Sequence, residues 1–352
     1  MVSSSAGPTG PVYGPPTSFP HVAARANADP RGSGTAAPVA EPRAAEPLRA
    51  AADGPVPTVV VVGSASRDLD PSDPRGWRLG GGATYGALVL ARLGLNVGVV
   101  LGVDAPAAEA PELDLLRAAG AELRLVRLPS GPTFQLTYSA AGRTLRCEDP
   151  GGPLPIAALP PAWRAAPAWY LAPVADELPD GWAAIPPGAV VALGWQGILR
   201  ELERGAPVRP RPPGPRALLR RADLVSVSTE DLDPTADLRG LLRLLRTGTL
   251  CTLTRGAQGG IAFAVRPGSP RMRLFPALPS GGDVDTTGAG DAFLAALLAA
   301  RIAPALAGRQ PHLPAALRFA AAVAALHVGG LGLAGTPTLR QVRDALRRSA
   351  PG

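Results

Sequence analysis

A run of four consecutive valines constrains the fold of this chain more than any other feature. In Thr58-Val-Val-Val-Val-Gly63, every residue between the two ends is apolar and β-branched. A strand with apolar side chains on both faces has to be covered on both faces, as in a parallel sheet between two layers of helices. A glycine-rich turn, Gly80-Gly-Gly82, and a helix-forming segment over 83–93 come next, and Gly94 ends that helix.

The alternation of strand-like and helix-like segments continues along the chain. Further strands are expected at 96–101, 122–128, 169–172, 189–193, 224–227 and 250–254, and helices at 113–119, 291–303, 314–328 and 339–348. Segments 134–139 and 144–147 form an expected antiparallel hairpin, whereas the proline-dense stretch 207–215 favours a surface loop. This alternation predicts an α/β layered fold with a largely parallel sheet.

Residues 1–57 differ in composition from the rest of the chain. They are rich in Pro, Gly, Ser and Ala and have no periodicity, so they cannot bury enough apolar surface to offset the entropy of ordering. We therefore expect a disordered tail over 1–57 and one ordered domain over 58–350. No apolar stretch is long enough to cross a bilayer, and no secretory signal precedes the domain, so neither a membrane span nor export is expected.

The basic character of the chain does not predict a nucleic-acid partner. The formal net charge is +7, but the chain contains no lysine, and its 35 arginines are scattered rather than clustered. The densest run, 340–348, has helical spacing and includes Asp344, which favours a solvated helix face. The two cysteines, Cys147 and Cys251, are far apart and suit a reducing cytoplasm, and no ligand spacing predicts a zinc site.

The segment with the clearest chemistry is Asp285-Thr-Thr-Gly-Ala-Gly-Asp291, which leads directly into a strong helix former over 292–298. Its glycines allow a tight turn and a close approach by a ligand, and the amides of 288–290 would lie at the positive end of the helix dipole. Such an anion site suits phosphoryl transfer, in which the enzyme positions the reactants and stabilises charge on the phosphate oxygens. Asp291 would then accept the proton of an attacking hydroxyl. An aspartate at a helix start is most often only an N-cap, but a cap does not require two glycines that flank an alanine.

This string resembles the C-terminal signature of the PfkB, or ribokinase-like, family of carbohydrate and nucleoside kinases. Segment Gly63-Ser-Ala-Ser-Arg-Asp68 resembles the family's first strand and turn, and 80–94 resembles its N-terminal glycine signature. Leu253-Thr-Arg-Gly-Ala-Gln-Gly-Gly260 is similar to its nucleotide-contacting turn. The resemblance implies a three-layer α/β/α sandwich in which ATP and substrate meet at the carboxyl ends of the strands.

The resemblance also implies roles for individual residues. Asp291 would be the catalytic base, and Gly288, Ala289 and Gly290 would form the anion hole. Residues expected on the acceptor side are Asp68, Gly81, Gly82 and Tyr85, and residues expected on the nucleotide side are Ser228, Thr254, Gly256 and Gly259. Arg143 and Arg200 are further candidates to meet phosphate or substrate oxygens, because the chain has no lysine.

Metal ions are implied at two places. In the stretch Ser228-Thr-Glu-Asp231, Ser228 stands where the family commonly has asparagine, and Asp231 or Glu230 would hold Mg²⁺ through water. The alternative for this stretch is a turn of the Ser/Thr type that opens a helix. Asp285 and Thr287 match positions that often help to hold a monovalent cation such as K⁺.

Other departures concern the acceptor. Tyr85 stands where the family's glycine signature usually has asparagine, which alters the reach and polarity of the pocket. The stretch from Asp68 to Gly80 is short, so a reduced or absent β-lid and a monomer or homodimer are expected. Gly194-Trp-Gln-Gly-Ile-Leu-Arg200 resembles a segment of short-lid, plant-type inositol kinases, although Trp195 at a strand end is equally compatible with a core residue.

The resulting hypothesis is a cytoplasmic phosphotransferase that moves the γ-phosphoryl group of Mg-ATP to a hydroxyl of a sugar, an inositol-like polyol or a nucleoside. The alternative is a catalytically weakened nucleotide- or sugar-binding regulatory protein of the same fold. An oxidoreductase is disfavoured because 63–68 lacks the G-x-G-x-x-G pattern of dinucleotide sites. A P-loop kinase is excluded because its phosphate-binding loop requires a lysine.

Overall fold

The structure, a computed structural model, describes residues 55–349 apart from 140–141, 234, 267, 269, 283 and 309–311, and describes no side chain over 138–143. The predicted tail over 1–57 therefore falls almost entirely outside the described residues. The described chain contains a nine-stranded sheet with strand order β16-β15-β14-β13-β9-β8-β1-β4-β5. Its strands are β1 (Val59–Ser64), β4 (Val97–Val103), β5 (Glu122–Arg127), β8 (Ala168–Leu171), β9 (Val190–Gly194), β13 (Leu224–Ser228), β14 (Leu250–Thr254), β15 (Gly260–Ala264) and β16 (Arg271–Phe275).

The sheet is mostly parallel, as predicted. Strands β14, β13, β9, β8, β1, β4 and β5 all pair in parallel. Only β15 and β16 pair antiparallel, at one edge. Neither of these two strands was predicted, since most of β16 is exposed and its alternating arginines do not resemble a buried strand.

The four valines of β1 lie in the middle of this sheet and are 0% exposed. Val59 and Val61 belong to one apolar cluster and Val60 and Val62 to another, so alternate side chains face opposite layers. The prediction of a strand covered on both faces is confirmed.

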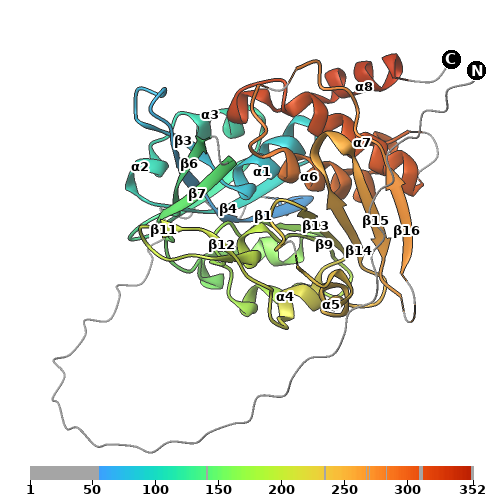
Figure 1. Cartoon of the computed structure of the whole chain (residues 1–352), viewed down its shortest axis with the longest axis horizontal. Coiled ribbons are helices and arrows are strands. Elements are labelled where there is room, and N and C mark those ends of the chain that lie inside the picture. Colours follow the sequence, from blue (N-terminus) through green and yellow to red (C-terminus); the bar gives the residue numbers. More distant parts are fainter. Residues whose placement is uncertain are drawn as a thin grey trace, which may run out of the picture. The chain divides into compact units, whose positions relative to one another are not determined.

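Helices cover both faces of the sheet (Figure 1). The Val59 face packs against α1 (Gly82–Arg92), α2 (Ala105–Ala108), α3 (Glu112–Ala118), α6 (Ala289–Ile302), α7 (Leu313–His327) and α8 (Leu339–Arg348). The Val60 face packs against α4 (Ala217–Arg221) and α5 (Leu238–Arg243). The arrangement is the expected three-layer α/β/α sandwich. Short 3₁₀ helices lie at Ile156–Ala158, Pro161–Ala165, Asp180–Ala183, Gln196–Leu199, Gly256–Gln258, Pro304–Leu306 and Gly332–Gly335.

A second sheet of five strands has the order β11-β7-β6-β2-β3. Its strands are β2 (Ser66–Leu69), β3 (Trp77–Gly80), β6 (Thr133–Ser139), β7 (Gly142–Asp149) and β11 (Ala206–Pro207). The predicted hairpin is confirmed as β6 and β7, which pair antiparallel. The stretch 66–80, where a reduced or absent β-lid was expected, contains β2 and β3, each of which is four residues long.

The prediction of a surface loop over 207–215 is wrong in part. It contributes to β11, and β12 (Arg209–Pro210) pairs with β10 (Arg200–Glu201). Both pairings involve two residues at a sheet edge, where a proline without an N–H group is tolerated. No helix in the described ranges is long and apolar enough to cross a membrane.

Candidate active site

A cavity of about 620 Å³ opens at the carboxyl ends of the parallel strands. Adjacent parallel strands end at the same edge of a sheet, so residues that are distant in sequence meet there. The predicted site residues that line it are Asp68, Gly81, Gly82, Tyr85, Ser228, Glu230, Asp231, Thr254, Gly256, Gly259, Thr287, Gly288, Ala289, Gly290 and Asp291. Asp285 is absent from the described lining, and the side chain of Arg143 lies outside the described residues.

The loop over 285–291 leads into α6, which begins at Ala289. Gly288 is the N-cap and has φ 80°, in the left-handed region that favours glycine. A Cβ atom on Gly288 would lie 2.5 Å from the ring of Tyr85, so this position requires glycine for two independent reasons. Asp291 is the third residue of the helix and not its cap, which removes the simplest alternative to a chemical role.

Two of the three amides expected in the anion hole are open toward a ligand. The amide of Ala289 donates to the main-chain oxygen of Thr286 at 3.2 Å, closing a turn. For the amides of Gly288 and Gly290 the described residues supply no acceptor. These two groups, at the positive end of α6, are therefore the ones available to a phosphate oxygen.

Asp291 borders the cavity but is densely surrounded by protein atoms. Tyr170 donates from its hydroxyl to Asp291 Oδ1 at 3.4 Å and to the main-chain oxygen of Asp291 at 3.2 Å. A Cβ on Gly82 would lie 2.5 Å from Oδ1, so a larger residue at this position would displace the carboxylate. Burial raises the pKa of Asp291 to about 7, and the charge of Asp231 acts in the same direction, against the Tyr170 hydrogen bond and Arg200. A carboxyl group with this pKa suits proton transfer near neutral pH.

Several solved structures that are similar to this chain are kinases of the ribokinase family. The chain is similar to a pyrophosphate-dependent kinase of the ribokinase family complexed with a pyrophosphate analogue and myo-inositol, at 22% identity and TM-score 0.61 over 82% of this chain and 99% of that one. It is also similar to Arabidopsis thaliana ribokinase complexed with ribose and ATP, at 20% identity and TM-score 0.58 over 83% and 99% of the two chains. A nucleoside kinase of Methanocaldococcus jannaschii matches at 14% identity and TM-score 0.57, over 84% and 100%.

The chain has the ribokinase fold. In addition, the family model described as pfkB family carbohydrate kinase matches residues 212–339. The resemblance inferred from the sequence is thereby confirmed, and the matches support the expectation of a carbohydrate-kinase phosphotransferase. The search of curated proteins found no match.

One end of the cavity in this ribokinase fold is largely apolar. Its walls include Phe275, Leu278, Phe293, Ala321, Ala324, Ala325 and Val328. Phe275 and Phe293 stack with their ring centroids 5.2 Å apart. Gly259 has φ 78°, and a Cβ there would lie 2.2 Å from the main-chain oxygen of Phe275, so the turn at 256–259 closes tightly on this apolar end.

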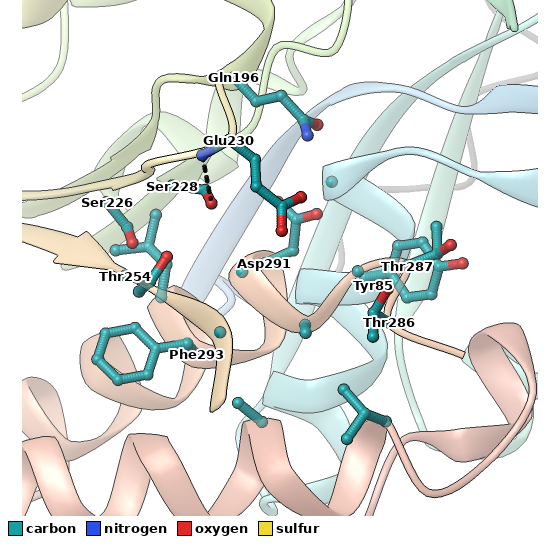
Figure 2. Close-up of a pocket in the computed structure, with 18 of the residues that line it drawn as sticks. Tyr85, Gln196, Ser226, Ser228, Glu230, Thr254, Thr286, Thr287, Asp291 and Phe293 are labelled. Atoms are coloured by element: carbon teal, nitrogen blue, oxygen red, sulfur yellow. Dashed lines mark hydrogen bonds between the residues drawn. The ribbon is translucent and has the colours of Figure 1, made fainter. Parts of the chain in front are cut away.

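The stretch 228–231 carries two carboxylates with different surroundings. The amide of Glu230 donates to Ser228 Oγ at 3.2 Å, which forms a turn of the Ser/Thr type, but the next helix, α5, begins only at Leu238 and not at this turn. Asp231 pairs with Arg200 at 3.1 Å and accepts from Gln196 at 3.4 Å. Figure 2 shows the Glu230 side chain extending in the direction of Asp291. Both predicted metal ligands line the cavity, and Asp231 lies in an ion pair with Arg200.

The other end of the cavity is formed by the second sheet and the turn after β1. Asp68 accepts from Ser66 Oγ at 2.9 Å. Gly80 leaves room for this carboxylate, because a Cβ there would lie 2.2 Å from Asp68 Oδ2. The apolar side chains of Phe134, Leu136 and Leu145 face the same space from β6 and β7.

Two residues important to this geometry were not found by sequence analysis. Tyr170 lies on β8 and Glu177 lies in the loop that follows it. Glu177 is 4% exposed, and its carboxylate accepts from the amides of Ser64 at 2.8 Å, Val174 at 3.0 Å and Ala175 at 2.9 Å. Burial raises the pKa of Glu177, although these amides oppose the effect. Neither residue belongs to a local motif, so no sequence pattern marks them.

Proposed function

We propose that this protein is an ATP-dependent kinase that transfers the γ-phosphoryl group of Mg-ATP to a hydroxyl of a sugar, an inositol-like polyol or a nucleoside. The observation that carries the proposal is the position of Asp291, whose pKa is raised to about 7, in the first turn of α6 beside two open amides. A proton acceptor and an anion site lie side by side in one cavity, which is the arrangement that phosphoryl transfer to an alcohol needs.

The proposed reaction requires Asp291 in its ionised form. Its carboxylate accepts the proton of the acceptor hydroxyl, and the hydroxyl oxygen bonds to the terminal phosphorus. The bond from that phosphorus to the bridging oxygen breaks, and ADP leaves with the electron pair. The amides of Gly288 and Gly290 stabilise negative charge on the terminal phosphate oxygens throughout.

The oxygen-bearing side chains at 228–231 are of the kind that magnesium binds. Mg²⁺ is commonly bound through one or two carboxylates together with substrate phosphates and water, so a closed protein cage is not needed. Within the described residues, no cluster of three or more His, Cys, Asp or Glu side chains forms such a cage. Glu230 and Asp231 would hold the ion, which neutralises charge on the donor phosphates. Ser228, in the place of the usual asparagine, would orient this turn.

ATP is favoured over pyrophosphate as the donor by the apolar end of the cavity. A planar base would be received by the walls around Phe275, Phe293 and Val328. Pyrophosphate has no apolar part and would leave this surface exposed to water. Pyrophosphate remains the donor to compare, because one of the similar structures is a pyrophosphate-dependent kinase.

The acceptor is proposed to be a small molecule with several hydroxyl groups. Asp68 offers carboxylate oxygens to hydroxyl donors, and Gly81 and Gly82 allow the main chain to approach the ligand. Tyr85 presents an aromatic side chain at the same end, and Arg143 is retained as a candidate on the predicted strand hairpin. A cytoplasmic enzyme, as a monomer or homodimer, remains our expectation.

A catalytically weakened regulatory protein is the second candidate. It is favoured by the ion pair between Asp231 and Arg200, which occupies one of the two carboxylates proposed for magnesium. Such a protein would bind nucleotide or sugar and release no product.

A phosphate-transfer screen separates these candidates. Purified protein is incubated with Mg-ATP or magnesium pyrophosphate and a panel of inositols, hexoses, pentoses and nucleosides, and release of ADP or phosphate is measured. We expect ADP release with at least one acceptor and a loss of about 10³-fold in kcat for Asp291→Asn, with ATP binding retained. ATP binding without turnover on any acceptor would favour the regulatory protein, and wild-type turnover by Asp291→Asn would remove the assigned base.

A further inference from the structure

His327, the last residue of α7, lies directly behind the loop that carries the anion site. It is 1% exposed, and its Nε2 atom lies 2.9 Å from the main-chain oxygen of Thr287. A carbonyl oxygen only accepts hydrogen bonds, so Nε2 carries the hydrogen and donates it. Nδ1 then accepts from Thr336 Oγ1, at 3.5 Å. The two contacts fix the tautomer and the direction of the imidazole.

The carboxylate of Asp285 is also occupied by donors of the protein. Its Oδ1 accepts from the amide of Thr287 at 2.9 Å, and its Oδ2 accepts from the amide of Gly332 at 3.0 Å. The amides of Val284 and Asp285 donate in turn to the main-chain oxygen of Val328, at 2.8 and 3.1 Å. The start of the loop is thus tied to the end of α7 and to the segment after it.

These contacts do not fit the monovalent cation that the family resemblance implies at Asp285 and Thr287. A bound cation needs oxygens whose lone pairs converge on a point free of positive groups. Here the carbonyl of Thr287 receives an imidazole N–H, and each carboxylate oxygen of Asp285 receives an amide N–H. Each of these three oxygens thus already uses a lone pair for a protein N–H group, and the positive hydrogen beside it opposes a cation at the same oxygen.

Tyr85 holds the imidazole from the other side. The Tyr85 and His327 rings meet edge to face, with centroids 5.4 Å apart and an angle of 85° between their planes. The face of the Tyr85 ring lies against Gly288, where a Cβ would approach it to 2.5 Å. His327, Tyr85 and Gly288 therefore form a continuous contact from α7 to the anion site.

The contact with Thr287 has a direct consequence for the anion site. In a planar trans peptide, the C=O of one residue and the N–H of the next point in opposite directions. The hydrogen bond from His327 turns the Thr287 carbonyl toward α7, so the amide of Gly288 is turned away from α7. That amide is one of the two that remain open toward a ligand.

We propose that His327 is a positioning residue that takes the place of a monovalent cation, so that this protein transfers phosphate without K⁺. The proposal rests on the kinase function proposed above. The imidazole N–H supplies the positive charge density that orients the Thr287–Gly288 peptide, and it does so as a permanent part of the fold.

The first test compares cations in the phosphate-transfer assay. Wild-type ADP release is measured in potassium chloride and in tetramethylammonium chloride at equal ionic strength, and the two rates should agree within about twofold. In His327→Ala, the rate without K⁺ should fall at least about tenfold and recover when K⁺ is added, whereas His327→Gln keeps an N–H donor and should remain independent of K⁺. The proposal would be overturned if K⁺ raised the wild-type rate by clearly more than about twofold. It would also be overturned if the rate of His327→Ala depended on K⁺ no more than the wild-type rate does.

The second test needs no turnover and therefore separates a failure of this proposal from a failure of the kinase assignment. Thermal unfolding is followed in the same two salts without substrates, because a cation that binds only the folded state raises Tm. The wild type should differ by less than about 1 °C, whereas His327→Ala should gain several degrees in K⁺. His312→Ala, which alters the N-cap of the same helix, is the matched control and should respond like the wild type. A potassium-dependent rise in the Tm of the wild type contradicts the proposal even if no acceptor is phosphorylated.

Discussion

The two ends of the cavity are built in different ways. At the proposed transfer site, the groups assigned to the reaction come from one continuous segment, 285–291, and two of them are main-chain amides. At the acceptor end, the lining comes from segments far apart in the sequence, including the turn after β1, the start of α1 and the β6–β7 hairpin. Phosphoryl transfer needs the same anion site and proton acceptor for every acceptor molecule, so one short segment of main chain is sufficient for it. Recognition of one particular acceptor depends instead on side chains from several elements.

The largest expected effect tests the main-chain conformation of the anion site at Gly288. Gly288→Ala would force a side chain into the left-handed region and against the Tyr85 ring, at a cost of about 1–3 kcal/mol in stability. We expect a loss of about 10²-fold or more in kcat/KM for ATP, measured by initial rates, because the amide of residue 288 would be displaced. Gly290→Ala is the control in the same loop, since a Cβ there meets no atom within 4 Å, and it should lose at least about tenfold less. Equal losses in the two variants would mean that the geometry of Gly288 is not what matters.

The next prediction concerns the two carboxylates between the ends of the cavity. The Glu230 side chain extends in the direction of Asp291, and Asp231 pairs with Arg200, so the two should respond differently to neutralisation (Figure 2). Glu230→Gln should raise the Mg²⁺ concentration needed for half-maximal activity by about tenfold, and Asp231→Asn should raise it less. A magnesium titration at saturating ATP measures both. The reverse order would assign the ion to Asp231.

A smaller effect, confined to the acceptor end, is expected from Glu177. Its buried carboxylate links the amide of Ser64, at the end of β1, to the loop that carries Val174. Glu177→Gln loses part of this set of bonds and should raise the acceptor KM by about three- to tenfold, with the KM for ATP nearly constant. Asp344→Asn, on exposed α8, is a control for the loss of one carboxylate. Equal increases in both KM values would contradict a role limited to the acceptor end.

The smallest effect is a displacement of the pH profile. With a pKa of about 7, Asp291 is protonated at low pH and gains its activity as pH rises through neutrality. The Tyr170 hydroxyl bonds to the ionised form and lowers this pKa, so Tyr170→Phe should move the rising limb of kcat to higher pH by less than about one unit. Initial rates between pH 5 and 9 measure it. A shift to lower pH would show that the hydroxyl does not stabilise the carboxylate.

The raised pKa of Asp291 also gives the sign of a stability effect. The folded-state pKa of about 7 exceeds the ordinary value of 3.8, so the unfolded chain releases this proton more readily. Asp291 therefore lowers the free energy of unfolding of the protein by an amount that grows as pH rises from about 4 to about 7 and is constant above that. Asp291→Asn should accordingly gain Tm over the wild type at pH 8 and gain little near pH 4.

The sequence alone predicted the layered fold and the segment that we propose as the transfer site. Continuous apolar runs such as 59–62 fit only strands covered on both faces, and the string 285–291 carries its glycines, its helix start and its carboxylate within seven residues. Local chemistry of this kind can be read because every group it needs is close in sequence. The same reasoning missed β2 and β3, which have only four residues each, and β16, which is mostly exposed. It also missed β15, a mostly buried strand of five residues that begins at Gly260.

Tertiary structure alone decided which distant groups act on that site. Tyr170 reaches Asp291 from β8, and His327 reaches Thr287 from the end of α7, 40 residues further along the chain. Packing also determined that Glu230 extends in the direction of Asp291 while Asp231 is paired with Arg200, although the two are neighbours in sequence. Burial, pKa and hydrogen-bond partner depend on what the fold brings within a few ångströms, and no pattern of neighbouring residues encodes that distance.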